Sequence, residues 1–144
     1  MRPEDIFDQH LNGTIYRDKQ VDSNGVHLTV DTIMEITGRG QIDFGGGEYE
    51  PAETCIIEPE KRSAGDDYGW WELPAGLYRV KFNESVLADN AGNFILLPNS
   101  RLIGCNCSLA PCCPGEGTIT TTLTVPETGL SIKENARIAL LVAT

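Results

Sequence analysis

Three short motifs near the C-terminal end contain the residues best suited to contact a charged ligand. They read PNSRL, PGEG and ARIALLV, in that order. The hydroxyl of Ser100 can donate a hydrogen bond to a phosphate oxygen, and Arg101 beside it carries a fixed positive charge. Glycines let a backbone approach a ligand closely, so Gly115 and Gly117 around Glu116 suit a binding turn. We expect these five residues to contact an anionic substrate.

Composition narrows the class of protein. The chain has 144 residues and a formal net charge of −10. That length predicts one domain, 1–144, with a core of its own. A strongly acidic chain is not expected to read a nucleic-acid backbone, although it can bind a nucleotide through local donors or a divalent cation. The sequence has no long apolar run and no N-terminal signal sequence, so we expect a cytoplasmic protein without a membrane partner.

Hydrophobic periodicity predicts strands over most of the chain. A short helix is expected within residues 1–13, where Pro3 suits the first turn. From residue 20 to residue 142, apolar residues alternate with polar ones, as in the run Val26, Leu28, Val30, and glycines and prolines separate the runs. This pattern is typical of half-buried strands. It predicts an all-β sandwich, jelly roll or barrel with no further helix, and exposed loops at residues 43–50 and 58–67.

Five segments resemble, in order, the sequence motifs of the dUTPase/dCTP deaminase superfamily. The first resembles a Gly-x-Asp-Leu strand, the third Pro-Arg-Ser-Ser-Leu, the fourth Asp-Pro-Gly-Tyr-Glu-Gly and the fifth Gly-x-Arg-Ile-Ala-Gln-Leu. The second resembles a strand pair that ends in a Glu. In chain order the segments are Gln20–Ile33, Trp71–Val86, Leu96–Leu102, Pro114–Gly117 and Glu134–Val142.

The resemblance implies a distorted, jelly-roll-like β-barrel of the dUTPase type. It also implies a homotrimer with sites at subunit boundaries, a deoxyribonucleoside triphosphate as ligand, and hydrolysis of dUTP to dUMP and pyrophosphate with magnesium. Ser100, Arg101 and the PGEG turn would then bind substrate. Gly25 and Arg137 would be structural or interface residues.

Several positions depart from the superfamily pattern. His27 stands where the first motif has Asp, and Cys112 stands where the Asp-Pro-Gly-Tyr-Glu-Gly motif has its Asp. Mg²⁺ prefers oxygen ligands to the nitrogen of a histidine, so no metal ligands are assigned. Gly115 replaces an aromatic residue and Leu140 replaces Gln. The deaminases need a Glu near Thr122, and deamination is therefore not expected.

The CNCSLAPCC segment leaves three alternatives open. Its four cysteines are spaced C-x-C and C-C, unlike the C-x₂-C of zinc sites. Buried free thiols, a disulfide such as one from Cys105 or Cys107 to the Cys112–Cys113 pair, and a bound metal all remain. Two other features have simple structural interpretations: Glu84 is expected to be an exposed acid at a strand end, and Trp70 and Trp71 are expected to pack in a core or an interface.

Three functional hypotheses follow. The order of the motifs favours a dUTP diphosphatase. The replaced acids at His27 and Cys112 favour a non-catalytic trimeric shell that binds nucleotides or a partner. The cysteine segment favours a metal- or redox-responsive module.

Overall fold

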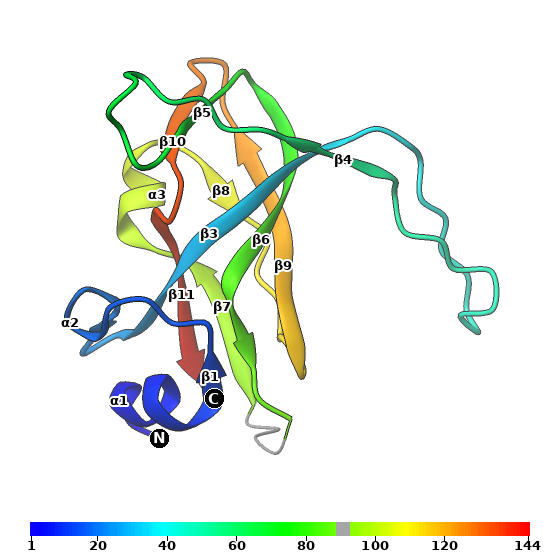
Figure 1. The fold of residues 1–144 in the computed structure, drawn as a ribbon. Coiled ribbons are helices and arrows are strands. Elements are labelled where there is room, and N and C mark those ends of the chain that lie inside the picture. Colours follow the sequence, from blue (N-terminus) through cyan, green and yellow to red (C-terminus); the bar gives the residue numbers. More distant parts are fainter. Residues whose placement is uncertain (89–92) are drawn as a thin grey trace.

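The computed structural model describes residues 1–88 and 93–144 and shows a strongly curved β-sheet that wraps into a nearly closed barrel (Figure 1). The main sheet follows the order β7-β11-β3-β6-β9-β8, with β1 paired to β6 and both β2 and β4 paired to β3. A second sheet consists of β10 and β5. The predicted all-β barrel with a short N-terminal helix is confirmed.

The strand bounds are as follows: β1 (Leu11–Asn12), β2 (Val21–Asp22), β3 (Gly25–Ile36), β4 (Thr54–Ile57), β5 (Trp70–Leu73), β6 (Gly76–Val86), β7 (Phe94–Pro98), β8 (Ser108–Leu109), β9 (Gly117–Val125), β10 (Leu130–Lys133) and β11 (Arg137–Ala143). The helical segments are α1 (Pro3–Asp5), which continues as a π-type turn, η1 (Ile6–His10), then α2 (Arg17–Gln20) and α3 (Ser100–Gly104).

The long central strands build the core with the period that the sequence predicts. Along β6 the side chains of Tyr78, Val80 and Phe82 are buried in turn, while the residues between them are more exposed. Successive side chains of a strand point to opposite faces, so one face of each strand fills the barrel. The buried set also includes Val26, Leu28, Val30, Ile33, Ile119, Leu123, Val125, Ile138 and Leu141.

Two contacts bring the edges of the curved sheet together. Leu96 of β7 exchanges backbone hydrogen bonds with Cys112, at N···O distances of 2.8 and 3.3 Å, so the β7 edge meets the segment that leads into β9. The indole of Trp71 is 2% exposed and donates to the carbonyl of Ile57 at 2.7 Å, which ties the small sheet to the barrel. Trp71 therefore packs in the core, as predicted.

The expectation of no helix beyond the N-terminal segment is wrong at α2 and α3. In α3, the Asn99 side chain accepts a hydrogen bond from the Leu102 N–H at 3.0 Å and caps the first turn. In the segment that leads into α2, the side-chain oxygen Oε1 of the buried Gln20 accepts from the N–H groups of Ile15 and Tyr16. Both turns depend on a polar side chain that satisfies backbone donors, a signal that hydrophobic periodicity does not contain.

A long hairpin projects from the barrel between β3 and β4, at the right of Figure 1. We call residues 38–53 the arm. It includes the predicted loop at 43–50, and the loop at 58–67 is also confirmed as largely exposed. Within the described ranges, no helix is long and apolar enough to cross a membrane.

Gly25 begins β3 at a point where another strand comes very close. An added Cβ there would lie 2.5 Å from the Leu141 carbonyl oxygen, so Gly25→Ala forces β3 and β11 apart. We expect the substitution to lower the free energy of unfolding by about 1–3 kcal/mol, measured by urea denaturation. Gly104→Ala is the matched control, because its Cβ would meet nothing within 4 Å. Equal stability of Gly25→Ala and the wild type would contradict this account.

Candidate functional site

Residues from the first, third and fifth of the five segments meet where α3, β3 and β11 come together. The side-chain nitrogen of Asn99 donates to the Arg137 carbonyl at 2.8 Å and lies 3.4 Å from Nδ1 of His27. The Asn99 N–H also donates to the Ile138 carbonyl at 3.0 Å. We call His27, Asn99, Ser100, Arg101 and Arg137 the Asn99 cluster. The structure thus brings together residues that are far apart in the sequence.

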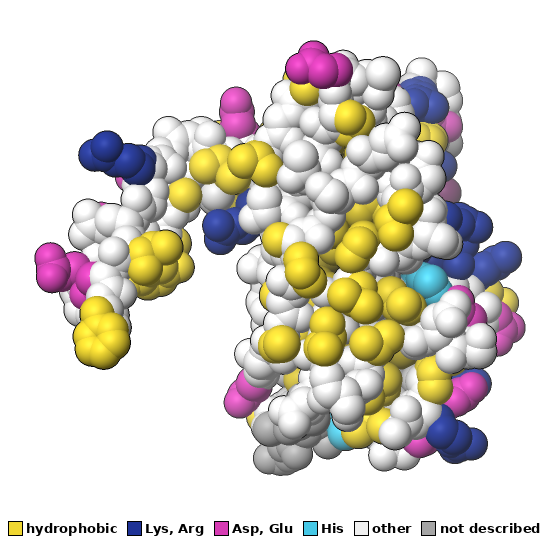
Figure 2. Space-filling view, turned by 180° about the vertical axis from the view of Figure 1, so that it is seen from behind, with side chains coloured by type: hydrophobic (Ala, Val, Ile, Leu, Met, Phe, Trp, Pro, Cys, Tyr) yellow, Lys and Arg dark blue, Asp and Glu magenta, His cyan; other side chains and the backbone are white. Residues whose placement is uncertain are grey.

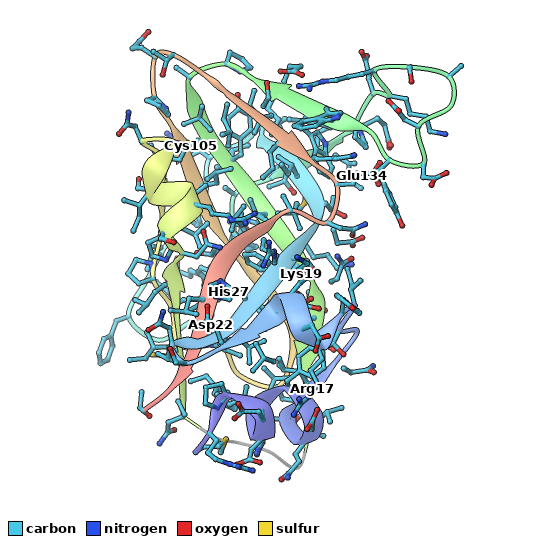
Figure 3. All side chains as sticks on the ribbon, turned by 90° about the vertical axis from the view of Figure 1, so that its left-hand side faces the viewer. Arg17, Lys19, Asp22, His27, Cys105 and Glu134 are labelled. Atoms are coloured by element: carbon cyan, nitrogen blue, oxygen red, sulfur yellow. The ribbon has the colours of Figure 1, made fainter. Side chains whose placement is uncertain are left out.

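His27 and Asp22 form a close pair on the β2–β3 hairpin (Figure 3). The distance from His27 Nε2 to Asp22 Oδ2 is 2.6 Å. Because the carboxylate accepts, Nε2 donates, and this leaves Nδ1 as the acceptor that faces the Asn99 amide. Burial alone would raise the pKa of Asp22, but the hydrogen bonds from His27 and the Asn24 N–H hold that pKa below its usual value. The pair is therefore a carboxylate-anchored imidazole.

Arg101 and Arg137 line one hollow of about 280 Å³ beside α3. Among the residues that the structure describes, neither side chain forms an ion pair with an acid. Arg137 donates instead to the Lys19 carbonyl at 2.5 Å. Two arginines that line one cavity without an acidic partner among the described residues suit a ligand with several negative charges.

The sequence analysis missed other residues of this hollow: Trp70, Lys133 and Asn135. Trp70 is half-buried under the guanidinium of Arg62, which lies 3.6 Å from the ring centre. Asn135 has a positive φ of 66°, typical of the turn that joins β10 to β11. The sequence offers one signal for two of these residues, because Lys133 and Asn135 lie shortly before Arg137 in the chain.

The PGEG turn lies away from the Asn99 cluster in the same chain. Gly115 and Glu116 line a separate hollow of about 400 Å³ with Phe94, the first residue of β7. The Asn99 cluster begins at the other end of β7, after Pro98, and four residue steps along a strand span about 14 Å. Gly117 starts β9 beside this second hollow, with φ +96°. One chain therefore does not join the predicted binding residues in a single site.

All five cysteines are free thiols in the structure. Burial raises the pKa of the Cys112 thiol and of the Cys107 thiol, so neither is predisposed to act as a thiolate nucleophile. Within residues 1–88 and 93–144, no group of three or more His, Cys, Asp or Glu side chains could hold a metal ion. Cys107 is buried and Cys112 is half-buried, whereas Cys105 and Cys113 are exposed, so the expectation of buried free thiols holds for only part of the CNCSLAPCC segment.

The residues of the Asn99 cluster do not fit a resident magnesium ion. The cluster's neighbouring carboxylate, Asp22, already accepts from His27 and from the Asn24 N–H. The imidazole of His27 offers nitrogen, whereas Mg²⁺ takes oxygen ligands in an octahedral arrangement. This donor set argues against a magnesium ion held by the cluster side chains alone.

Comparison with known proteins identifies the lineage. No family model matches the chain. A probable deoxyuridine 5'-triphosphate nucleotidohydrolase from Methanosarcina mazei is 31% identical over 135 residues, which cover 91% of this chain and 75% of the relative. Proteins with the same name from Methanosarcina acetivorans and Archaeoglobus fulgidus are 30% and 32% identical, with 75% and 71% of their lengths covered.

The chain belongs to the dUTPase family. The resemblance inferred from its motifs is thereby confirmed, together with a place in nucleotide metabolism among the hydrolases. Within this dUTPase-related protein, Ser100 is exposed at the start of α3, and Arg101 is exposed beside it. Leu140, where the motif has Gln, lies directly opposite His27 in the β11–β3 ladder.

The interpretation of Glu84 as an exposed strand-end acid is wrong. Its side chain is 0% exposed, inside the barrel of this dUTPase-related fold. One carboxylate oxygen accepts from the Thr29 N–H at 2.8 Å, and the other accepts from the Thr29 hydroxyl at 2.6 Å and from Gln20 Nε2 at 2.9 Å. Gln20 Nε2 also donates to the His27 carbonyl at 2.9 Å. The burial pattern of β6 places Glu84 on the inward face, a position that its period-2 spacing from Phe82 already indicated.

Burial raises the pKa of the Glu84 carboxyl, although hydrogen bonds from Thr29 and Gln20 oppose the rise. The folded state therefore binds this proton more tightly than the unfolded chain does. The resulting stabilisation is fully present below the unfolded pKa, about 4.3, and is lost as the pH rises through the folded pKa. We therefore compare the free energies of unfolding of the wild type and of Glu84→Gln. We expect the wild-type value minus the variant value to fall as the pH rises above about 4.5.

Urea denaturation at a series of pH values measures this difference. Glu58→Gln, which removes an exposed loop carboxyl, is the control for a general effect of charge. A difference that stays flat or increases with pH would show that Glu84 is not held in the environment described above.

Proposed function

We propose that this protein binds dUTP and hydrolyses it to dUMP and pyrophosphate. The observation that carries the proposal is the pair Arg101 and Arg137, which line one hollow beside the exposed hydroxyl of Ser100 and form no ion pair among the described residues. In a chain with a net charge of −10, such a cavity is a local site for a polyanion. The related proteins named as probable dUTP nucleotidohydrolases support dUTP as that polyanion.

The site residues would act by binding and orienting the substrate. Guanidinium groups can contact two phosphate oxygens at once, and the Ser100 hydroxyl can donate to a third. Water would then form a bond to the α-phosphorus and lose a proton to the solvent, while the bond from the α-phosphorus to the bridging oxygen of the β-phosphate breaks and pyrophosphate leaves. The charge that develops on the leaving group would be stabilised by the same arginines. Magnesium, in this proposal, arrives as the counter-ion of the triphosphate.

The separation of the two hollows supports a homotrimer as the active form. The PGEG turn borders the cavity at the Phe94 end of β7, whereas the arginines border the cavity at the other end. A neighbouring copy would bring its PGEG turn to the Asn99 cluster and complete the site with Gly115, Glu116 and Gly117. The five free thiols are in keeping with a reducing compartment, and we place the protein in the cytoplasm.

One observation favours a second candidate, a trimeric shell that binds the nucleotide without hydrolysing it. Cys112, at the position of the Asp in the Asp-Pro-Gly-Tyr-Glu-Gly motif, is half-buried and exchanges backbone hydrogen bonds with Leu96. Its thiol cannot replace a carboxylate that orients water. In this alternative, the Asn99 cluster would bind the triphosphate and the reaction would not follow.

The test is a panel of deoxyribonucleoside triphosphates, each assayed for binding and for pyrophosphate release with and without Mg²⁺. We expect dUTP to be hydrolysed and Arg101→Ala to lower kcat/KM by about tenfold or more, because it removes a charge-assisted contact with phosphate. Ser100→Ala should lower kcat/KM by a smaller factor. Both side chains are exposed, so neither change should affect folding.

Lys61→Ala, in the exposed loop at 58–67, is the matched control for loss of a positive charge and should leave kcat/KM unchanged. Tight binding of dUTP without pyrophosphate release would replace the first candidate by the second. Failure to bind any nucleotide in the panel would exclude both.

A further inference from the structure

The arm carries large apolar side chains that no other described residue of its chain covers. Phe44 is 107% exposed, Ile42 is 87% exposed and Tyr49 is 56% exposed. Figure 2 shows hydrophobic side chains on the arm, held away from the barrel. A contiguous set of exposed apolar residues on a projecting segment marks an interaction site more often than a solvated loop.

Hydrogen bonds give the arm a defined shape. Gln41 and Glu50 exchange backbone hydrogen bonds at 2.8 and 3.0 Å, and Gln41 Nε2 donates to the Glu48 carbonyl at 2.7 Å. At the tip, Asp43 accepts from the N–H groups of Gly46 and Glu48 at 3.0 and 2.9 Å. The base of the arm is fixed by the β3–β4 ladder. A preorganised hairpin loses little conformational entropy on binding, so its apolar side chains can contribute fully to an interface.

The barrel presents an apolar surface that the rest of the described chain also leaves uncovered. β7 and β11 pair with Leu97 opposite Leu140 and Ile95 opposite Val142, and these four side chains are partly exposed on the face away from the core. We call them the β7–β11 face. Hydrophobic side chains gather in a patch on the barrel in Figure 2. Both faces of these two strands are therefore apolar, as expected for strands that are buried on both sides.

Charge favours contact between the arm and this face. The arm contains four acidic residues and one arginine. In a protein with a net charge of −10, most surfaces would repel it. β7 and β11 contain no Asp or Glu, and their single charged residue is Arg137. The β7–β11 face is thus an apolar surface that an acidic arm can approach without repulsion.

We propose that the arm of one copy docks on the β7–β11 face of a second copy of this chain. Phe44 and Ile42 pack on Leu97, Leu140 and their neighbours, and the arm leaves Arg137 free for the nucleotide. The arm projects from its own barrel, so only another copy can satisfy both surfaces at once. The docking clamps the assembly and does not depend on dUTP being the substrate.

The test uses the full-length chain with p-benzoylphenylalanine in place of Phe44. Equal amounts of ¹⁴N- and ¹⁵N-labelled protein are mixed, irradiated and digested. We expect cross-linked peptides of mixed isotope that join the arm to residues 94–98 or 137–143. In parallel, Phe44→Ser combined with Ile42→Ser should weaken self-association at least tenfold by sedimentation equilibrium. Tyr68→Ser, which removes an exposed aromatic residue outside the arm, should not.

Three results would overturn the proposal: a protein that stays monomeric at all concentrations, cross-links within one chain or outside the β7–β11 face, or unchanged association of the arm variant. Hydrolysis of dUTP by the wild type is measured separately. If the protein assembles without the predicted cross-links, only the docking of the arm is rejected. If the wild type binds no nucleotide, only the proposed function is rejected.

Discussion

A single amide side chain, that of Asn99, holds together the part of the molecule on which the candidate site depends. Its oxygen caps α3, and its nitrogen binds the Arg137 carbonyl and faces His27. The side chain is buried, so each of these contacts replaces a contact with water that it cannot make. The cap on α3 fixes the positions of Ser100 and Arg101. The hydrogen bond from the Asn99 side chain to the Arg137 carbonyl fixes the position of Arg137. An arginine at this position, as in the superfamily motif, could not accept the capping hydrogen bond.

A second polar network fixes the strands behind the cluster. Glu84, Thr29 and Gln20 share hydrogen bonds inside the barrel, and Gln20 extends them to the His27 carbonyl. A buried carboxylate is costly unless its lone pairs are satisfied, and here three donors serve its two oxygens. The network links α2, β3 and β6. Through the hydrogen bond from Gln20 to the His27 carbonyl, it also fixes the backbone of His27 beside the Asn99 cluster. The binding surface is thus supported by interior hydrogen bonds as well as by apolar packing.

The distribution of charge and apolar surface points to function through assembly. The arginines gather on one side of α3, the PGEG turn lies at the far end of β7, and an apolar arm extends into solvent. Each of these features is incomplete in one chain. In the proposals made above, neighbouring copies complete the nucleotide site, and the arm fastens one copy to the next. The absence of acids at positions 27 and 112 does not disturb the elements proposed to bind phosphate, because the positions of those elements depend on Asn99 and on the backbone.

The sequence by itself determined the family, the barrel and the inward face of each long strand. It did so because period-2 alternation, as in Tyr78, Val80 and Phe82, is a local property of a half-buried strand. The helices α2 and α3 were missed although their side-chain contacts span only three to five positions, because hydrophobic periodicity does not contain that signal. The sequence also did not determine which partners Glu84 finds in the interior, which residues lie beside His27, or the distance between the PGEG turn and Arg101. These depend on contacts between distant residues, such as Thr29 with Glu84 and His27 with Asn99, which are 55 and 72 positions apart. Only the tertiary structure could decide them, because a polar side chain is buried or exposed according to the partners that the fold brings to it.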